Sequence, residues 1–139
     1  MVDLVRDKID SEKAKQGVWV DITDFGRVKI RRWNNPDYRN RAMDLRDAKL
    51  EELGKTPQDM LSDDESFGIM VRAACEEIIV DWEGIEADGK PVAYDSKLAI
   101  AAFTDPDDSW RDEFNLIVSA ASSREKYAQE RKEENTKKP

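Results

Sequence analysis

The sequence contains no histidine and only one cysteine, Cys75, among its 139 residues. A Ser-His-Asp triad, a Cys-His pair, a histidine-ligated zinc or iron site and a histidine general base are therefore impossible within this chain. One thiol cannot form an internal disulfide, which favours a reducing compartment. Because Cys75 falls in an apolar stretch without a histidine to activate it, we interpret it as a small core residue.

Long apolar runs and glycine-rich loops are missing as well. No run approaches the roughly 18–20 residues that a membrane-spanning helix needs, and the N-terminus alternates charged with apolar side chains, unlike a signal peptide. The six glycines are scattered as turn and cap residues, so no phosphate-binding loop is present. We therefore expect a soluble intracellular protein that is not an enzyme and has no cofactor, metal or membrane partner.

Charge is abundant and unevenly distributed. Charged and hydrophobic residues each make up 39% of the chain, and the formal net charge is −8. Residues 27–49 carry a net charge of +5, and residues 57–88 carry −9. These segments are either complementary patches, between subunits or between elements of one subunit, or two solvated faces. The basic segment is also the one candidate for binding nucleic acid, which the overall negative charge makes unlikely.

The first part of the chain has the period of β-structure. Residues 1–16 are polar and predict a flexible charged arm. Val18, Val20 and Ile22 fall on one side of an extended segment, and after a turn that contains Gly26 residues 27–31 alternate strictly between charged and apolar side chains. The alternation predicts a β-hairpin over 18–33, with Val28 and Ile30 facing inward and Arg27, Lys29 and Arg31 facing outward.

The rest of the chain has mainly helical spacing. Asn35 and Pro36 predict the start of a helix over 36–53. Ser62 and Glu65 form a capping-box pattern before a strongly apolar helix over 63–81. We therefore predict a mainly α fold with a small N-terminal hairpin and about four helices around the helix 63–81, in one globular domain over 17–124. The remaining segments are predicted helices over 96–103 and 106–124, and a charged, fraying tail over 125–139.

Two acidic clusters coincide with predicted helix starts. Acidic side chains favour the positive end of the helix dipole, so capping explains both clusters, and a hard cation is the alternative. Neither cluster has the glycine and glutamate positions of a calcium loop. The clusters are Asp63, Asp64 and Glu65, and Asp105, Asp107, Asp108 and Asp112.

Two stretches carry a resemblance to a known family. Residues 81–95 read tryptophan, glycine, a short acidic turn with Gly89-Lys90, then extended residues before an alanine-rich helix. Upstream, a hairpin with tryptophan and phenylalanine precedes the helix start Asn34-Asn35-Pro36-Asp37-Tyr38. Over roughly residues 17–128 the chain resembles the tail assembly chaperones of long-tailed, non-contractile bacteriophages (siphophages).

The resemblance implies a protein made in the cytoplasm of the infected bacterium and absent from the finished virion. It would bind the tape measure protein, keep it soluble, recruit major tail protein subunits and associate with itself. A longer form made by a ribosomal frameshift is common in such chaperones. The alternatives are another small phage structural part, such as a head–tail completion protein, and a nucleic-acid-binding regulator.

For this role we expect contacts on the hairpin and on the helix that follows it. Apolar side chains would contact the partner, and outward basic side chains would orient a ring or spiral of subunits. The four tryptophans are typical of core packing, with Trp19 and Trp33 as alternative interface anchors. The predicted contact residues are Trp19, Val28, Ile30, Trp33, Tyr38, Arg27, Lys29 and Arg31.

Overall fold

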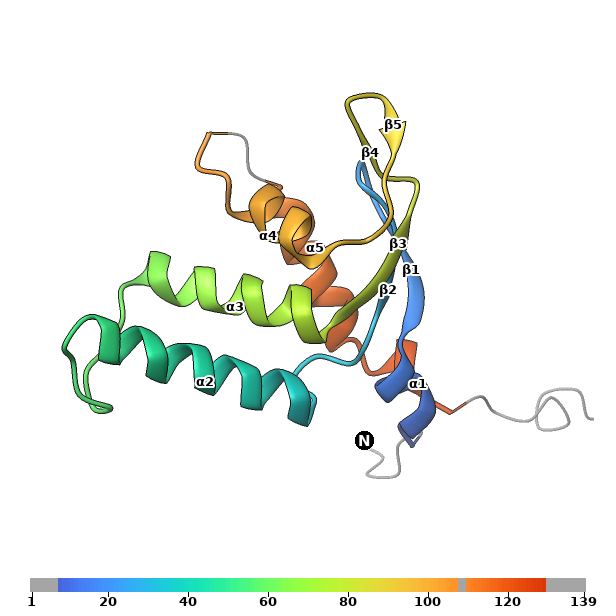
Figure 1. The fold of residues 1–139 in the computed structure, drawn as a ribbon. Helices are drawn as coiled ribbons and strands as arrows, with labels where there is room; N and C mark the ends of the chain where they lie inside the picture. Colours follow the sequence, from blue (N-terminus) through green and yellow to red (C-terminus); the bar gives the residue numbers. More distant parts are fainter. Residues whose placement is uncertain (1–7, 108–109, 130–139) are drawn as a thin grey trace, which may run out of the picture.

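The computed structural model describes residues 8–107 and 110–129. Within them, a three-stranded antiparallel sheet lies beside a set of helices, and a two-stranded hairpin projects from one end of this sheet (Figure 1). In chain order the elements are α1 (Ser11–Gln16), β1 (Val18–Ile22), β2 (Gly26–Ile30), α2 (Pro36–Glu52), α3 (Asp63–Glu77), β3 (Ile79–Glu83), β4 (Glu86–Ala87), β5 (Lys90–Pro91), α4 (Ser96–Thr104), α5 (Arg111–Ser122) and the 3₁₀ helix η1 (Glu125–Tyr127).

The larger sheet has the order β1-β2-β3, so β2 is its central strand. Val28 on β2 lies opposite Val20 on β1 and Trp82 on β3, and all three are buried on the inner face. A bulge between Lys29 and Ile30 inserts an extra residue into β3. This bulge allows Ile79 and Trp82, three residues apart, both to reach the core.

The fold class differs from the sequence-based prediction, which was mainly α with one hairpin. About 52% of the described residues are helical and 18% lie in strands, so the protein is an α/β mixture. The central helix does not run over 63–81, because it ends at Glu77 and residues 79–83 form β3. The apolar residues of 78–82 fit a helical period as well as a bulged strand. The partner that decides between the two, β2, lies about fifty residues away in sequence.

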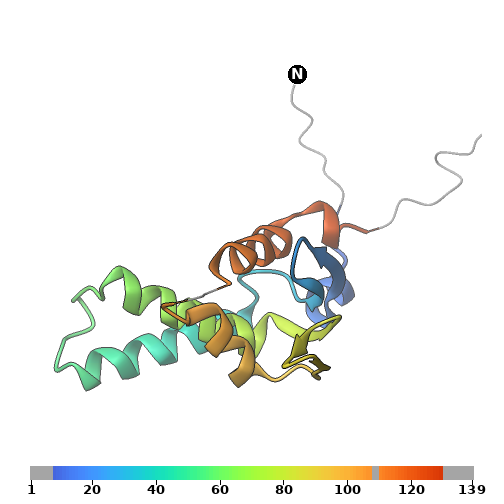
Figure 2. The same ribbon diagram turned by 90° about the horizontal axis from the view of Figure 1, so that it is seen from above.

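The helices pack in two directions from the sheet. Ala99 and Phe103 of α4 and Phe114 and Ile117 of α5 are buried and close the core over the sheet. The α2–α3 pair lies side by side in both views and projects away from the sheet (Figures 1 and 2). The projection leaves most of α2 at the surface, with only Tyr38 and Leu50 buried.

The helix starts follow their capping residues with one exception. Asn35 Oδ1 accepts a hydrogen bond from the Tyr38 amide at 2.9 Å. The predicted capping box at Ser62 and Glu65 is confirmed, with hydrogen bonds of 3.1 and 3.0 Å. The last helix was expected at 106 but begins at Arg111. The Asp105 carboxylate instead accepts from the Asp107 amide at 2.9 Å, which stabilises a turn before the helix.

The two ends of the described chain contact each other. Ile9 forms a β-bridge with Ala128, and the Tyr127 hydroxyl donates to the Ile30 carbonyl oxygen at 2.9 Å. Tyr127 is fully buried, so the tail predicted to fray from 125 is packed through its first residues, and residues 11–16 of the predicted arm form α1. Tyr127 is the one aromatic residue in the charged segment 125–139, and this pattern does not predict that the start of the segment is packed. The rest of that arm and tail, 1–7 and 130–139, lies outside the described residues.

Candidate functional site

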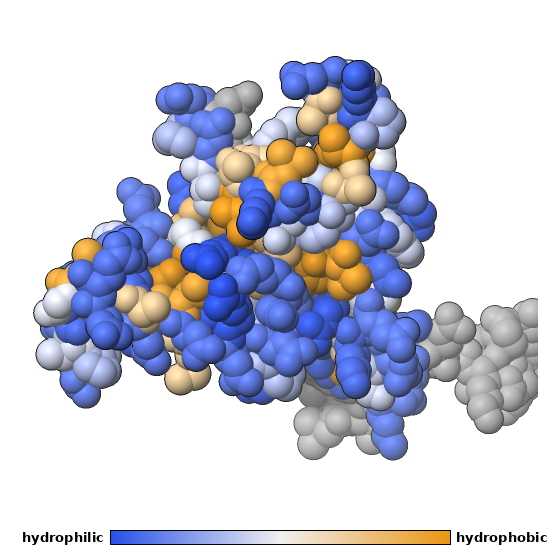
Figure 3. Space-filling view, in the orientation of Figure 1, coloured by the Kyte–Doolittle hydropathy of each residue, from blue (hydrophilic) through white to orange (hydrophobic). Residues whose placement is uncertain are grey.

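The β4–β5 hairpin, α4 and the β1–β2 turn enclose an apolar cleft of about 360 Å³. Figure 3 shows hydrophobic surface gathered between α4 and this hairpin, while the projecting tips on either side are hydrophilic. The lining residues are Phe25, Trp82, Ile85, Glu86, Ala87, Val92, Leu98, Ala102 and Trp110.

Local backbone chemistry builds the hairpin wall of the cleft. Asp88 and Gly89 have φ values of 53° and 77°, as the two central residues of a tight hairpin turn require. Gly26 allows this wall to approach the β1–β2 turn, because a Cβ there would lie 2.6 Å from Ile85 Cδ1. The absence of a side chain at residue 26 therefore leaves the space that the Ile85 side chain occupies.

Aromatic rings form the floor of the cleft and continue into the core. The centroid of the Phe25 ring lies 6.1 Å from that of Trp82, 5.6 Å from that of Phe103 and 5.5 Å from that of Trp110. The Trp82 indole also donates to the Val92 carbonyl oxygen at 2.9 Å. Rings held on several sides lose little conformational freedom when a partner binds, so the floor is preorganised for contact.

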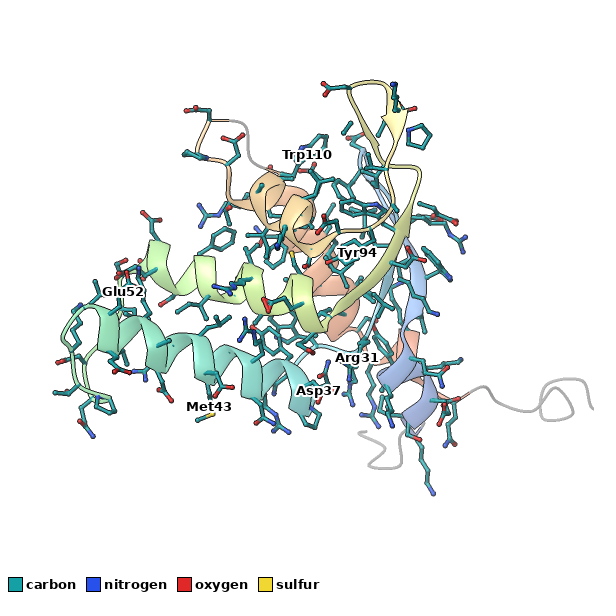
Figure 4. All side chains as sticks on the ribbon, viewed as in Figure 1. Arg31, Asp37, Met43, Glu52, Tyr94 and Trp110 are labelled. Atoms are coloured by element: carbon teal, nitrogen blue, oxygen red, sulfur yellow. The ribbon has the colours of Figure 1, made fainter. Side chains whose placement is uncertain are left out.

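Two large apolar side chains remain exposed at the rim. Leu98 on α4 and Trp110 at the start of α5 are each 39% exposed. Figure 4 shows Trp110 on the same side of the molecule as the hairpin, away from Arg31 and Asp37. Exposed apolar surface beside a preformed cleft is typical of a protein-binding or ligand-binding site.

Carboxylates border this apolar surface. Asp24 precedes the lining residue Phe25, and the loop that follows Ala102 and α4 carries exposed Asp105 and Asp107. On the opposite wall, Glu86 lines the cleft and Asp88 occupies the tip of the hairpin.

The sequence predicted contact residues elsewhere, and the structure buries three of them. Val28 and Ile30 are fully buried on the inner face of β2, and Tyr38 is 9% exposed. The half-buried Trp33 ring packs against Tyr38 with centroids 4.5 Å apart. Val28 and Ile30 offer no surface to a partner. β3 pairs with the free edge of the hairpin, and helices cover the inner face of the sheet on which both side chains lie. Val28, Ile30 and Tyr38 are core positions of the subunit.

The outward residues of the predicted site are engaged within the subunit. The Arg27 guanidinium lies 5.2 Å from the centroid of the Trp19 ring and pairs with Glu83 at 2.8 Å. Arg31, which is mostly buried, donates to Asp37 Oδ2 at 2.8 Å and to the Glu77 carbonyl oxygen at 3.1 Å. These contacts hold Arg27 and Arg31 on their own sheet and helices.

The remaining basic residue of that face, Lys29, lies opposite Trp19 on β1 and Asp81 on β3 in the strand register. With Arg27 and Trp19 it belongs to the outer face of the sheet.

The basic and acidic segments meet inside one subunit. Arg41 on α2 donates to Glu76 on α3 at 2.7 and 3.3 Å, and Arg72 donates to the same carboxylate at 3.3 Å. Burial raises the pKa of Glu76, but the hydrogen bonds and charges of Arg41 and Arg72 outweigh it and hold the pKa below its usual value. Of the arrangements left open by the sequence, the structure shows complementary contact between elements of one subunit.

The structure confirms that Cys75 is a core residue. It is 1% exposed on α3, and the Tyr94 hydroxyl donates to its carbonyl oxygen. Burial raises the pKa of the Cys75 thiol to about 12, so the thiol stays protonated at neutral pH.

Neither acidic cluster forms a metal site in the part of the chain that the structure describes. No group of three or more histidine, cysteine, aspartate or glutamate side chains within residues 8–107 and 110–129 is arranged to hold a metal ion. Asp63, Asp64 and Glu65 occupy the first turn of α3, while Asp108 lies outside the described residues. No described helix combines the length and the apolar character that crossing a membrane requires.

Sequence reasoning missed the cleft because its residues come from segments with different periods. The four tryptophans, Trp110 among them, have the pattern of core residues, and residues 81–95 have that of a short acidic turn followed by extended residues. The available signal was Asp88-Gly89 with apolar residues on either side, which is typical of a two-residue hairpin. The way this hairpin packs against α4 depends on tertiary contacts that local spacing does not reveal.

One comparison with known proteins identifies a family. The family model described as YdaY prophage protein matches residues 33–138, about three quarters of the chain. Every residue that lines the cleft except Phe25 lies in the matched range. No curated protein and no solved structure matches the chain. The match makes this a phage-derived protein and does not specify a step of phage assembly.

Proposed function

We propose that this chain, which belongs to the YdaY prophage protein family, is a tail assembly chaperone of a siphophage. It binds the tape measure protein in the cytoplasm of the bacterial host, keeps it soluble and recruits major tail protein. It acts by contact and by self-association and catalyses no reaction. It leaves before the virion is complete.

The observation that supports this proposal is the aromatic cleft with its exposed rim. A chaperone for a long helical protein needs a surface that buries apolar side chains of its client repeatedly and reversibly. The cleft offers Trp110 and Leu98 on a floor fixed by Phe25 and Trp82. Burial of apolar area contributes roughly 25 cal/mol per Å² before the costs of association, so one such cleft gives modest affinity per site.

The test is co-expression with the tape measure protein of the same prophage. We expect soluble tape measure protein in the presence of the chain and insoluble protein in its absence. The variants Trp110→Ala and Leu98→Ser should reduce the soluble fraction severalfold. Met43→Ser is the matched control, because Met43 is 62% exposed on α2, far from the cleft.

The contrary outcome is an insoluble tape measure protein whether or not the wild-type chain is present. Mass spectrometry of purified virions separates the alternative, because a head–tail completion protein remains in the particle whereas a chaperone does not.

A further inference from the structure

The segments that border the cleft carry mostly negative charge. Five exposed carboxylates stand on them, against Lys90 on β5, Lys97 on α4 and Arg111 on α5, whose guanidinium stacks on the Phe67 ring at 3.8 Å. Arg27, on the neighbouring strand, is paired with Glu83 and Asp21 at 2.8 and 3.5 Å. The carboxylates belong to Asp24, Glu86, Asp88, Asp105 and Asp107.

We propose that the cleft binds a helical protein segment in which apolar anchor side chains are flanked by lysine or arginine. The apolar anchors enter the aromatic floor, and the basic side chains lie against the carboxylates of the two walls. The inference deepens the proposed function, and it rests on that function only for the identity of the client protein. It names the sequence chemistry by which the client is recognised.

The shape of the site supports the apolar part of this segment. Its volume of about 360 Å³ falls at the small end of the range of about 300–1,000 Å³ that is typical of binding pockets. Of the lining side chains, only Glu86 carries a charge. A compact apolar or aromatic side chain therefore finds van der Waals partners throughout, whereas a charged one would lose its hydration without a partner.

The borders support the basic part. Glu86 lines one wall and acts directly on the occupant of the cleft. The other carboxylates stand on neighbouring segments and add to the negative potential around the opening, within the roughly 8 Å over which charges interact at physiological ionic strength. A segment with lysine or arginine beside its anchors gains attraction from several directions. An acidic segment, a nucleic acid or an anionic membrane would be repelled.

Within residues 8–107 and 110–129, no segment with this chemistry lines the cleft. Residues 130–139 contain lysine and arginine but no large apolar side chain. Residues 1–7 combine four apolar side chains with Asp3, Arg6 and Asp7, a net charge of −1, and they precede Lys8, whose carbonyl oxygen accepts from the Gln129 amide. That contact lies beside α1, at the end of the sheet away from the β4–β5 hairpin (Figure 1). The occupant is therefore another protein.

The experiment uses two synthetic peptides of about 18 residues, or five helical turns. Both carry the same leucine and phenylalanine face, and the polar face is lysine in one and glutamate in the other. We expect the full-length protein to bind the lysine peptide at least about tenfold more tightly in fluorescence anisotropy, with weaker binding as salt is raised. Equal affinities for the two peptides, or no binding of either, would overturn the proposal.

Two sets of variants locate the binding. The triple variant Glu86→Gln, Asp88→Asn and Asp105→Asn should remove most of the preference for lysine, because each change deletes a charge and preserves shape. Trp110→Ala should weaken the binding of both peptides about tenfold.

The matched control neutralises three exposed carboxylates on α2 with Asp44→Asn, Asp47→Asn and Glu51→Gln. It changes the net charge by the same amount and should leave the preference intact. A loss of preference in this control as large as in the cleft variant would assign the effect to overall charge and refute the proposal.

The outcomes separate this inference from the chaperone function. Suppose that the cleft binds the lysine peptide selectively but the tape measure protein stays insoluble. The inference about peptide chemistry is then supported, and the tape measure protein is refuted as the client. A tape measure protein made soluble by a chain that binds both peptides alike would leave the function standing and reject the inference.

Discussion

The cleft and the projecting α2–α3 pair differ in what holds them together. The walls of the cleft join a continuous aromatic cluster in which Phe25 contacts three other rings. The α2–α3 pair adds polar contacts, with Arg41 on Glu76 near the sheet and Arg46 on the carbonyl oxygens of Pro57 and Asp59 in the loop between the helices. Exposed ion pairs contribute little to stability, whereas buried rings contribute much. The apolar surface open to a partner thus rests on a cluster of packed aromatic rings.

The largest effect expected from this comparison follows from removing the ring of Trp82. Trp82→Ala leaves a void under the cleft and the Val92 carbonyl oxygen without its indole donor. We expect a loss of about 3–5 kcal/mol in the free energy of unfolding, measured by urea denaturation, together with loss of peptide binding.

Leu50→Ala is the matched control on α2, where Leu50 is one of two buried residues. It should cost about 2–5 kcal/mol yet leave the affinity of the folded protein for the peptide unchanged. A binding defect in Leu50→Ala equal to that in Trp82→Ala would show that the two regions are not independent.

A smaller loss of stability is expected at Gly26. A methyl group added there tests how closely the β1–β2 turn packs against the hairpin wall of the cleft. In Gly26→Ala the new Cβ would meet Ile85 Cδ1 at 2.6 Å and the Glu83 carbonyl oxygen at 3.0 Å. We expect a loss of about 1–3 kcal/mol and weaker peptide binding, because Ile85 must move.

The control substitution, Gly68→Ala, is expected to raise the free energy of unfolding. This residue lies within α3 and has open space around its Cα, so Gly68→Ala should add about 0.5–1 kcal/mol of stability. Thermal unfolding of the two variants measures the contrast. A stabilised Gly26→Ala variant would mean that the hairpin wall is not held at this distance.

Sequence reasoning succeeded where local chemistry decides the structure. Asn35 and the Ser62–Glu65 pair mark the starts of α2 and α3 because a cap involves residues within three positions of each other. The same reasoning extended α3 through residues that form β3, because their pairing with β2 is not local. It also chose Val28 and Ile30 as contacts, since alternation identifies an inward face and does not reveal whether helices cover it.

The ion pairs of α2 and α3 give a third, weaker contrast, which depends on pH. The pKa of the Glu76 carboxyl is lower in the folded protein than its usual 4.5, so its contribution to stability is present above that pH. The contribution is lost as the pH falls through the folded-state value. Because the partners are partly exposed, we expect less than about 1 kcal/mol.

The measurement is urea denaturation from neutral pH down to the acid limb for wild type and Glu76→Gln. The variant should be less stable at neutral pH and should approach the wild type in acid. Parallel pH profiles of the two proteins would contradict the assignment of this acid sensitivity to Glu76.

The smallest effect on stability should come from the rim, where stability and binding separate. Leu98 is 39% exposed and Met43 is 62% exposed, so Leu98→Ser and Met43→Ser should each change the free energy of unfolding by about 0.5 kcal/mol or less. Binding of the lysine peptide should nevertheless weaken severalfold in Leu98→Ser alone, because only Leu98 lines the cleft. Anisotropy titrations of the two equally stable variants give the comparison. If both variants bind like the wild type, exposed apolar surface at the cleft carries no more function than exposed apolar surface on α2.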